Sequence, residues 1–327
     1  MKIALVDSDK IKVKEVDDIT LDGRNGAIVK VLGCGLCGSD IVKFVHKIAK
    51  DGTVLGHEIV AEIVEINSKS DFKIGDEIVT SHHIPCGECV YCKHGNVSMC
   101  KHFKSTNIRP GGFSEYVYIS EEHLLNVAQL KPKNLSDIEA SFYEPLGCIV
   151  RAVKRANLLD GDKALVVGLG SIGILTAQAL KAYGAKVVGC DLIPERIEKL
   201  KSLGIEAIDV RNLPDEFKAD AIFMTSGADK AIDTALKYVR NGGKIIVFSS
   251  TPHDESAYPN NEIYYRELTV MGSYSPSPKD LKESLDLLQS GKVNVKNLST
   301  QYSLENIQQA FDDTMTNKIM KAYIKIN

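Results

Sequence analysis

Hydrophobic and polar positions follow different patterns in the two halves of the chain. Up to about residue 145, short runs rich in valine and isoleucine are separated by glycine, aspartate and asparagine, a pattern typical of strands joined by turns. These runs predict strands at 27–32, 59–66 and 77–80, and Gly75-Asp76 predicts a turn before the last of them. We therefore expect the first half to be β-rich.

From about residue 150, short apolar runs alternate with segments in which apolar residues recur every three or four positions. The predicted strands are 163–167, 186–190, 219–225, 244–249 and 268–271. The predicted helices are 172–183, one beginning at Pro194, and 229–239, which we expect to end at Asn241-Gly242-Gly243. Strands and helices in alternation imply a mostly parallel sheet with helices on both faces.

The tail after about residue 277 predicts two helices, 279–290 and 304–315, and a closing strand, 322–326. Gly291 is the expected end of the first of these helices. No internal repeat or low-complexity segment interrupts this order of elements.

Composition narrows the class of protein. A length of 327 residues favours two domains, and 44% apolar with 25% charged residues is an ordinary globular balance. A formal charge of -3 gives no basic surface for nucleic acid. The first apolar run has only four residues before Asp7, too few for a signal peptide, and no run approaches a membrane span. We expect a soluble, cytoplasmic protein, whose cysteines stay reduced.

Four of the eight cysteines lie close together in the sequence. Cys86, Cys89, Cys92 and Cys100 follow the pattern C-x2-C-x2-C-x7-C, which can surround one tetrahedral zinc ion. Such a site has no open coordination position, so the pattern predicts a structural zinc. An iron–sulfur cluster and a chance grouping are the alternatives. The nearby histidines are expected to be solvated loop residues, since four thiolates already complete the site: His82, His83, His94 and His102.

A glycine pattern marks the start of the second half. Gly168-Leu169-Gly170-Ser171-Ile172-Gly173 fits G-x-G-x-x-G, directly after a predicted strand and at the start of a predicted helix. In that context the backbone approaches a dinucleotide pyrophosphate, which the helix N-terminus binds.

The residues after the next strand indicate which dinucleotide binds. Asp191 lies at the end of that strand, where a carboxylate hydrogen-bonds the adenosine ribose and repels a 2′-phosphate. Leu192 and Ile193 carry no compensating positive charge, so we expect NAD rather than NADP. Arg196 is a candidate to stack on the adenine. Asp191 as a solvated turn residue and Arg196 as a surface residue remain the alternatives.

Three separated segments supply a second set of metal-ligand side chains. They contain Cys37, His57-Glu58 and Glu144, each close to glycines that allow sharp backbone bends. A thiolate, an imidazole and a carboxylate would hold zinc with one coordination position open, as a catalytic zinc requires.

These motifs together carry a family resemblance. With GDEIV at 75–79, GGFSEY at 111–116 and the glycine pattern, the chain resembles the zinc-containing medium-chain alcohol and polyol dehydrogenases, nearest to the sorbitol and threonine dehydrogenase branch. The resemblance implies a GroES-like catalytic domain at 1–149 and 277–327, with the cysteine lobe at about 82–104. It implies a doubly wound Rossmann domain at 150–276, a cleft between the two, and a homodimer or homotetramer.

The same resemblance implies roles for single residues. Cys37 and His57 match the first two zinc ligands. Glu58 matches a carboxylate that binds the metal or exchanges on and off it, and Glu144 matches either the third ligand or the residue that holds the zinc-bound water. The choice between these two carboxylates stays open.

The resemblance also bears on proton transfer and on the substrate pocket. Ser39 matches the hydroxyl that hydrogen-bonds the substrate alcohol. Val42 stands where many relatives have a proton-relay histidine, so the proton must leave by another route, such as the cofactor ribose, Glu58 or water. Lys43 and His46 are expected at the surface. Pocket candidates are Phe103 and Tyr274.

The expected function is reversible transfer of a hydride between NAD and a small alcohol or polyol, with two zinc ions per chain, one catalytic and one structural. Two alternatives remain: an NADPH-linked aldehyde or ketone reductase on the same scaffold, and a non-catalytic NAD-binding protein. Both become less favoured when the complete ligand set and Asp191 are considered together.

Overall fold

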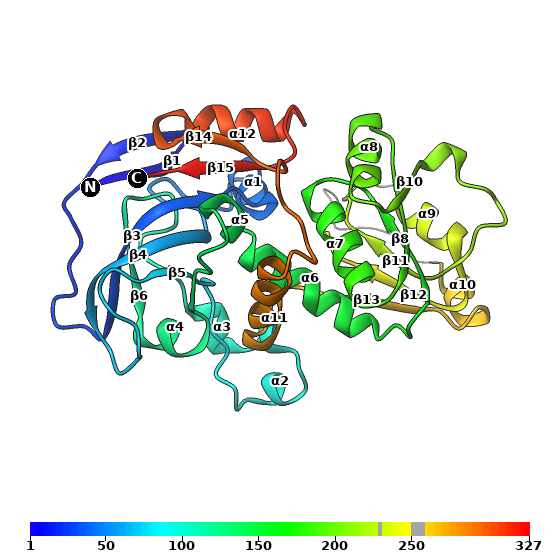
Figure 1. The fold of residues 1–327 in the computed structure, drawn as a ribbon, viewed down its shortest axis with the longest axis horizontal. Coiled ribbons are helices and arrows are strands. Elements are labelled where there is room, and N and C mark those ends of the chain that lie inside the picture. The colour runs from blue at the N-terminus through cyan, green and yellow to red at the C-terminus, as the bar shows by residue number, and fades with distance from the viewer. Residues whose placement is uncertain (228–230, 250–258) are drawn as a thin grey trace. The chain divides into compact units, whose positions relative to one another are not determined.

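The computed structural model describes residues 1–227, 231–249 and 259–327 (Figure 1). The described chain forms two compact units, treated separately below. The first comprises Met1–Pro145, Ser277–Gln289 and Val295–Asn327, and the second Leu146–Pro276 and Ser290–Asn294. The division thus falls four residues earlier than the expected 149/150, and 290–294 joins the second unit.

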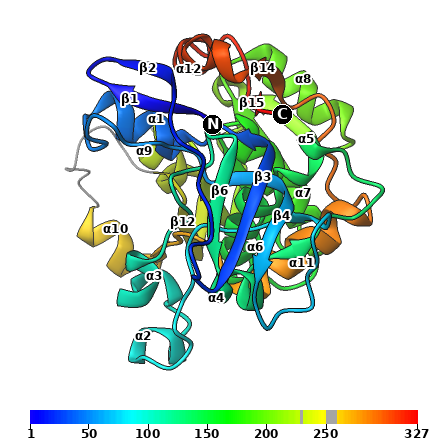
Figure 2. The same cartoon turned by 90° about the vertical axis from the view of Figure 1, so that its left-hand side faces the viewer.

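The first unit contains a seven-stranded sheet in the order β14-β15-β3-β4-β5-β7, with β6 paired to β3. Its strands are β3 (Gly26–Gly35), β4 (Glu58–Asn67), β5 (Glu77–Val79), β6 (Tyr116–Ser120), β7 (Gln129–Leu130), β14 (Thr300–Ser303) and β15 (Ala322–Lys325). Figure 2 shows β3 lying beside β4 and β6. The predicted strands 27–32 and 59–66 lie inside longer ones, whereas 77–80 and 322–326 each extend one residue beyond the observed strand; the expected β-rich first half is confirmed.

A separate hairpin begins the chain and was not among the predicted elements. Strand β1 (Lys2–Asp7) pairs antiparallel with β2 (Lys10–Glu15). In β2, Ile11 is buried between exposed lysines, the alternation expected of a strand with one covered face. The sequence analysis missed this strand because lysine at every second position gives the segment a polar composition.

One apolar core holds the first unit together. It joins residues of β3 and β4, such as Val29 and Ile63, to Phe311 of helix α12 (Ile307–Met315), all fully buried. The Phe311 ring meets those of Phe44 and Phe113 edge-on at 5.4 and 6.2 Å. The C-terminal helix therefore supports α1 (Gly38–Val45), which carries Phe44.

The remaining helices of the first unit are short. They are α2 (Val90–Lys93), η1 (Val97–Met99), α3 (Lys101–Ser105), α4 (Glu121–Asn126), α5 (Asp137–Ala140), α11 (Pro278–Gln289) and η3 (Leu304–Asn306). The predicted tail helix 304–315 is thus split into η3 and α12. Helix α6 (Tyr143–Ala156) begins in the first unit and continues into the second.

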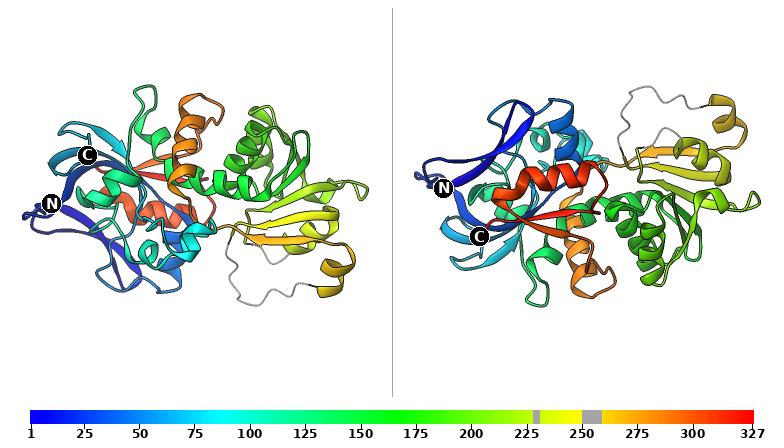
Figure 3. Two further views of the ribbon diagram at one scale, coloured as in Figure 1. Left: turned by 90° about the horizontal axis from the view of Figure 1, so that it is seen from below. Right: turned by 90° about the horizontal axis from the view of Figure 1, so that it is seen from above.

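The second unit is a six-stranded, entirely parallel sheet in the order β10-β9-β8-β11-β12-β13. Its strands are β8 (Lys163–Val167), β9 (Lys186–Asp191), β10 (Glu206–Asp209), β11 (Ala219–Met224), β12 (Val239–Val247) and β13 (Thr269–Gly272). Its other elements are α7 (Ser171–Ala182), α8 (Pro194–Ser202), η2 (Val210–Asn212), α9 (Ala231–Tyr238) and α10 (Asn260–Tyr265). Helices lie on both faces of this sheet (Figures 1 and 3), and the doubly wound Rossmann prediction is confirmed.

Two predictions in this unit need correction. Strand β10 was missed, because its four residues carry only two apolar side chains. The prediction that α9 ends at Asn241-Gly242-Gly243 is wrong: it ends at Tyr238, and 239–247 form β12. The register between β11 and β12 jumps from Val239 to Lys244, so the glycines form an irregularity inside a strand. Asp229, the predicted start of α9, lies outside the described residues.

Glycine at position 173 is required by close packing. A Cβ atom there would lie 1.8 Å from the carbonyl oxygen of Gly168, so any side chain would push α7 away from the end of β8. The glycine pattern therefore serves the helix–strand contact that it predicts. Within the described ranges, no helix has both the length and the apolar character needed to cross a bilayer.

Candidate active site

Sheet register brings three distant segments together at one end of the first unit. Gly35 at the end of β3 pairs with Glu58 at the start of β4, and with Tyr323 of β15 on its other side. A Cβ atom on Gly35 would lie 2.0 Å from Oε2 of Glu58, so only glycine leaves room for that carboxylate. Cys37 follows two residues after β3 and caps α1. Cys37, His57 and Glu58 offer ligand atoms within 4.8 Å of one another.

Asp40 fixes the geometry of the two segments that carry Cys37 and His57. It is fully buried in the first turn of α1, and its Oδ2 accepts a hydrogen bond from the Cys37 backbone N–H at 3.2 Å. Its Oδ1 accepts from the Gly56 N–H at 3.4 Å and lies 3.3 Å from His57 Nδ1. A carboxylate on the second nitrogen of a metal-binding imidazole orients the ring and increases its basicity. Sequence analysis missed this residue.

Buried charges also alter the pKa of His57. Burial lowers that pKa, but the Asp40 carboxylate and the Cys37 thiolate outweigh burial and raise it well above its usual value. The acidic groups around His57 therefore favour positive charge at the position of this imidazole.

Lys321 is a second residue that the sequence analysis missed. Its ammonium group is 4% exposed and lies 2.5 Å from Oε2 of the fully buried Glu58 carboxylate. Nζ also donates to the Leu36 carbonyl oxygen at 3.2 Å. Burial lowers the pKa of Lys321, but the charges of Glu58 and Cys37 raise it above the usual value, so the lysine stays charged. Its ammonium group is thus the positive partner of the Glu58 carboxylate.

The donor set fits a metal ion. Among the described residues, Glu58 Oε1 is buried without a hydrogen-bond partner. Leaving a buried carboxylate oxygen unsatisfied costs roughly 1–3 kcal/mol or more, so such atoms usually have an ion or water beside them. A sulfur, a nitrogen and this oxygen are the ligands that zinc prefers. Cys37, His57 and Glu58 would therefore hold it.

A second cluster shares His57 with the first. His57, His82 and Glu144 also offer ligand atoms within 4.8 Å of one another. Glu144 is 5% exposed, in the first turn of α6. The imidazole rings of His57 and His82 are 4.5 Å apart, and His82 Nδ1 is buried without a hydrogen-bond partner in the described part of the chain.

The prediction that His82 and His83 are solvated is wrong. The His83 ring packs between His82, at 3.9 Å, and Phe103, at 4.7 Å, and its Nδ1–H donates to the Thr106 carbonyl oxygen. Burial lowers the pKa of His83 to about 4. Proximity to the cysteines in sequence gave no signal that these rings turn toward His57 instead. His94 is exposed, as expected.

A cavity of about 390 Å³ opens beside this site, and its wall includes His57, His82 and Asp40. Lys43, expected at the surface, is half-buried and also lines it, whereas His46 is exposed. Ser39 is exposed on the first turn of α1, and Val42 is 37% exposed on the same helix.

The two pocket candidates lie elsewhere. Phe103 is buried against His83 and does not line the cavity. Tyr274 belongs to the second unit, where it is 62% exposed and its carbonyl oxygen accepts a hydrogen bond from Arg151.

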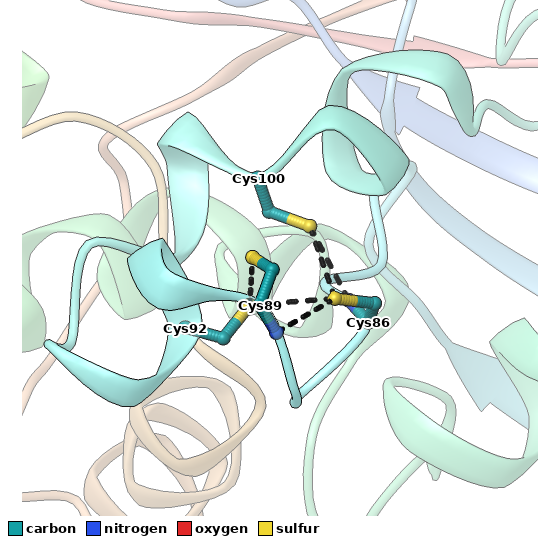
Figure 4. A group of neighbouring side chains, drawn as sticks. All are labelled: Cys86, Cys89, Cys92 and Cys100. Atoms are coloured by element: carbon teal, nitrogen blue, oxygen red, sulfur yellow. Dashed lines mark hydrogen bonds between the residues drawn. The ribbon is translucent and has the colours of Figure 1, made fainter.

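The four-cysteine lobe forms a second candidate metal site. Figure 4 shows the side chains of Cys86, Cys89, Cys92 and Cys100 pointing toward one another. Sulfur–sulfur distances are 3.5 Å for 86–100, 3.6 Å for 89–92 and 4.0 Å for 86–92. Four sulfurs bound to one zinc at 2.3 Å would lie about 3.8 Å apart, so the arrangement fits zinc. All four are free cysteines.

The lobe has little else to hold it in shape. Val90, Tyr91 and Met99 are 60%, 46% and 39% exposed, so several apolar side chains of the lobe face water rather than a core. The Cys89 N–H donates to the Cys86 sulfur at 3.4 Å, a contact that orients a thiolate toward a metal. Bound zinc would therefore supply most of the stability of this segment.

The glycine pattern of the second unit has the geometry that dinucleotide binding needs. Gly168 has φ +95° after β8, and Gly170 caps α7, leaving the first amides of that helix available. Ser171 and Ile172 begin the helix and are half-buried.

Asp191 lies against the same loop. Its Oδ2 accepts from the Leu169 N–H at 2.6 Å, and its Oδ1 accepts from the Leu192 and Ile193 amides at 2.7 and 2.9 Å. The side chain is 8% exposed, so it is not a solvated turn residue. Arg196 lies 3.6 Å from Oδ2 and therefore orients Asp191 electrostatically.

Replacing Cys89 by serine tests the structural site. Because three thiolates hold zinc far less tightly than four, we expect Cys89→Ser to lose one zinc per chain and to unfold several degrees lower. Metal analysis and thermal denaturation give the two quantities. The buried Cys190→Ala variant serves as control, since it should keep all its zinc. A Cys89→Ser protein with unchanged zinc content and stability contradicts the assignment.

Comparison with known proteins places this geometry in a family. The family model "Alcohol dehydrogenase GroES-like domain" matches residues 23–129, and "Zinc-binding dehydrogenase" matches 171–290. The chain is 32% identical to a sorbitol dehydrogenase of Halalkalibacterium halodurans, over 92% of each chain. It is 30% identical to D-xylulose reductase A of Aspergillus oryzae, over 96% of this chain and 93% of that protein.

A solved structure supports the same conclusion. The 2R,3R-butanediol dehydrogenase from Bacillus subtilis is 25% identical and superposes with a TM-score of 0.85, covering 100% of this chain and 99% of the other. These relatives carry an oxidoreductase role on small alcohols. Together with the ligand set and the glycine loop, they show that the chain belongs to the zinc-containing medium-chain alcohol and polyol dehydrogenases.

Proposed function

We propose that this protein is a zinc- and NAD-dependent dehydrogenase that interconverts a small alcohol or polyol and its ketone or aldehyde. The observation that carries the proposal is the buried group of Cys37, His57 and Glu58, with an unsatisfied carboxylate oxygen, beside a cavity of about 390 Å³. Three ligands leave one position of a tetrahedral metal for the substrate. The two relatives named for sorbitol and xylulose support a polyol as that substrate.

The proposed third ligand is Glu58. It belongs to the cluster that contains Cys37, whereas Glu144 shares a cluster with His57 and His82. The ion pair with Lys321 engages Oε2 and leaves Oε1 for the metal. Glu144 and His82 would then lie close enough to contact the water or substrate in the open position.

The chemistry divides between the cofactors and the chain. When bound, zinc supplies a Lewis acid that lowers the pKa of the substrate hydroxyl, and NAD supplies the hydride acceptor. Alcohol and NAD⁺ give carbonyl compound, NADH and one proton. Asp40 holds the imidazole of His57 in place, and Lys321 pairs with Oε2 of Glu58 and so orients that carboxylate. Ser39, two residues after Cys37, would hydrogen-bond the substrate hydroxyl.

Cofactor choice follows from Asp191. Its carboxylate is held against the glycine loop by three backbone amides, which supports hydrogen bonding to ribose hydroxyls and repulsion of a 2′-phosphate. Gly168, Gly170 and Gly173 would allow the pyrophosphate to approach the N-terminus of α7. Arg196, paired with Asp191, would lie beside the adenosine.

Removing the thiolate ligand tests the metal mechanism. We expect Cys37→Ala to lose one zinc per chain and all measurable turnover while remaining folded. Cys34→Ala is the matched control, because Cys34 is a buried thiol on β3, three residues before Cys37, and belongs to no candidate metal cluster among the described residues. Normal turnover by a Cys37→Ala protein that lacks this metal would contradict the proposal.

Neutralising the carboxylate tests the cofactor assignment. The wild type should use NAD at least about 100-fold more efficiently than NADP. Asp191→Asn keeps an acceptor oxygen but removes the charge, so kcat/KM for NADP should rise about tenfold, with a smaller fall for NAD. Arg196→Met shows whether the paired arginine contributes. A wild type that prefers NADP would instead favour the NADPH-linked reductase.

A further inference from the structure

The cavity beside His57 has a positively charged wall. Besides His57, His82 and Asp40, it is lined by Lys43, Lys50 and Asn107. All of these residues belong to the first unit. A cavity that includes both a proposed zinc ligand and two lysines allows one substrate molecule to contact the metal and an ammonium group.

Both lysines are available for a ligand. In the described part of the chain, no carboxylate oxygen lies within 4.0 Å of the ammonium group of Lys43 or Lys50. Among the described residues that line the cavity, Asp40 is the only acidic one, and it already contacts the Cys37 and Gly56 amides and His57. Its negative charge is therefore compensated within the protein.

Backbone hydrogen bonds hold the two lysines on the same wall. The Lys43 carbonyl oxygen, at the end of α1, accepts from the N–H groups of Ile48 and Ala49 at 2.9 and 3.0 Å, which folds the following loop back onto the helix. The Thr53 N–H then donates to the Lys50 carbonyl oxygen at 3.0 Å. These hydrogen-bonded turns hold the loop that carries Lys50 close to Lys43 at the end of α1.

Lys43 contributes positive charge to the cavity. Lys43 is half-buried, so its field is screened less than that of a fully exposed lysine. A pocket with net positive charge raises the local concentration of anions.

We propose that the natural substrate is a polyol that carries an anionic group, a carboxylate or a phosphate, and that Lys43 and Lys50 bind this group while a hydroxyl of the same molecule faces the zinc site. This inference rests on the proposed function and specifies its substrate class. Ammonium groups recognise carboxylates and phosphates through charge-assisted hydrogen bonds.

Matched six-carbon substrates test the proposal: sorbitol, gluconate and sorbitol 6-phosphate, assayed with the zinc-loaded wild type and with Lys43→Met and Lys50→Met. We expect kcat/KM of the wild type for at least one anionic substrate to exceed that for sorbitol about tenfold or more, and each variant to lose about tenfold on that substrate. Sorbitol should change less than twofold. The better of the two anions identifies the group.

The control variant is Lys47→Met, on the same loop but outside the cavity wall. It should match the wild type on all three substrates. Equal efficiency of the wild type on sorbitol and both anions, or an equal loss on all three substrates in Lys43→Met, would overturn the proposal while leaving the dehydrogenase function intact.

A binding measurement separates this inference from the proposed function. If none of the three substrates is oxidised, titration calorimetry with inorganic phosphate on the zinc-loaded protein decides the cavity assignment independently of the proposed function. Binding by the wild type and Lys47→Met, weakened at least about tenfold in the Lys43→Met/Lys50→Met double variant, supports it. Equal binding by all three proteins, or no binding by any, contradicts it.

Discussion

Compensation of buried negative charge is the constraint on which the first unit depends. Glu58, Asp40 and Glu144 are at most 5% exposed, and all lie in the clusters around His57. Transferring carboxylates from water to the interior costs several kcal/mol each unless a positive partner compensates them. Lys321 compensates Glu58 only at Oε2, which leaves Oε1 buried without a partner among the described residues. A divalent cation at this point would satisfy the remaining oxygen and would offset the negative charge.

The two candidate metal sites differ in how the protein holds their ligands in place. The ligands around His57 are held by the fold itself, through the register of β15, β3 and β4 and through Asp40, so the metal can leave one position open without loss of shape. The cysteine lobe has few buried side chains and approaches a closed tetrahedron of sulfurs. In the lobe a bound metal would stabilise the protein segment, whereas beside His57 the folded protein would position the metal. That difference supports a catalytic role for one site and a structural role for the other.

Features written in local sequence could be predicted, and those set by tertiary pairing could not. The cysteine spacing, the glycine loop with Asp191, and the ligands Cys37 and His57 are short motifs whose chemistry follows from residue type. Asp40 and Lys321 lie within ordinary stretches of sequence and acquire their roles only when Gly56 and Glu58 are brought beside them. His82 was assigned to solvent because four thiolates already complete the nearby site, although its ring packs on His57. The glycines at 242 and 243 interrupt a strand, where a helix end was the stronger local signal.

X-ray diffraction data collected on both sides of the zinc absorption edge, from crystals of the purified protein, test the central claim most directly. The account predicts two anomalous peaks per chain. One should be surrounded by the sulfurs of Cys86, Cys89, Cys92 and Cys100, and the other by Cys37 sulfur, a His57 nitrogen and the Glu58 carboxylate. A single peak in the cysteine lobe, from protein that oxidises alcohols at an undiminished rate, would contradict it.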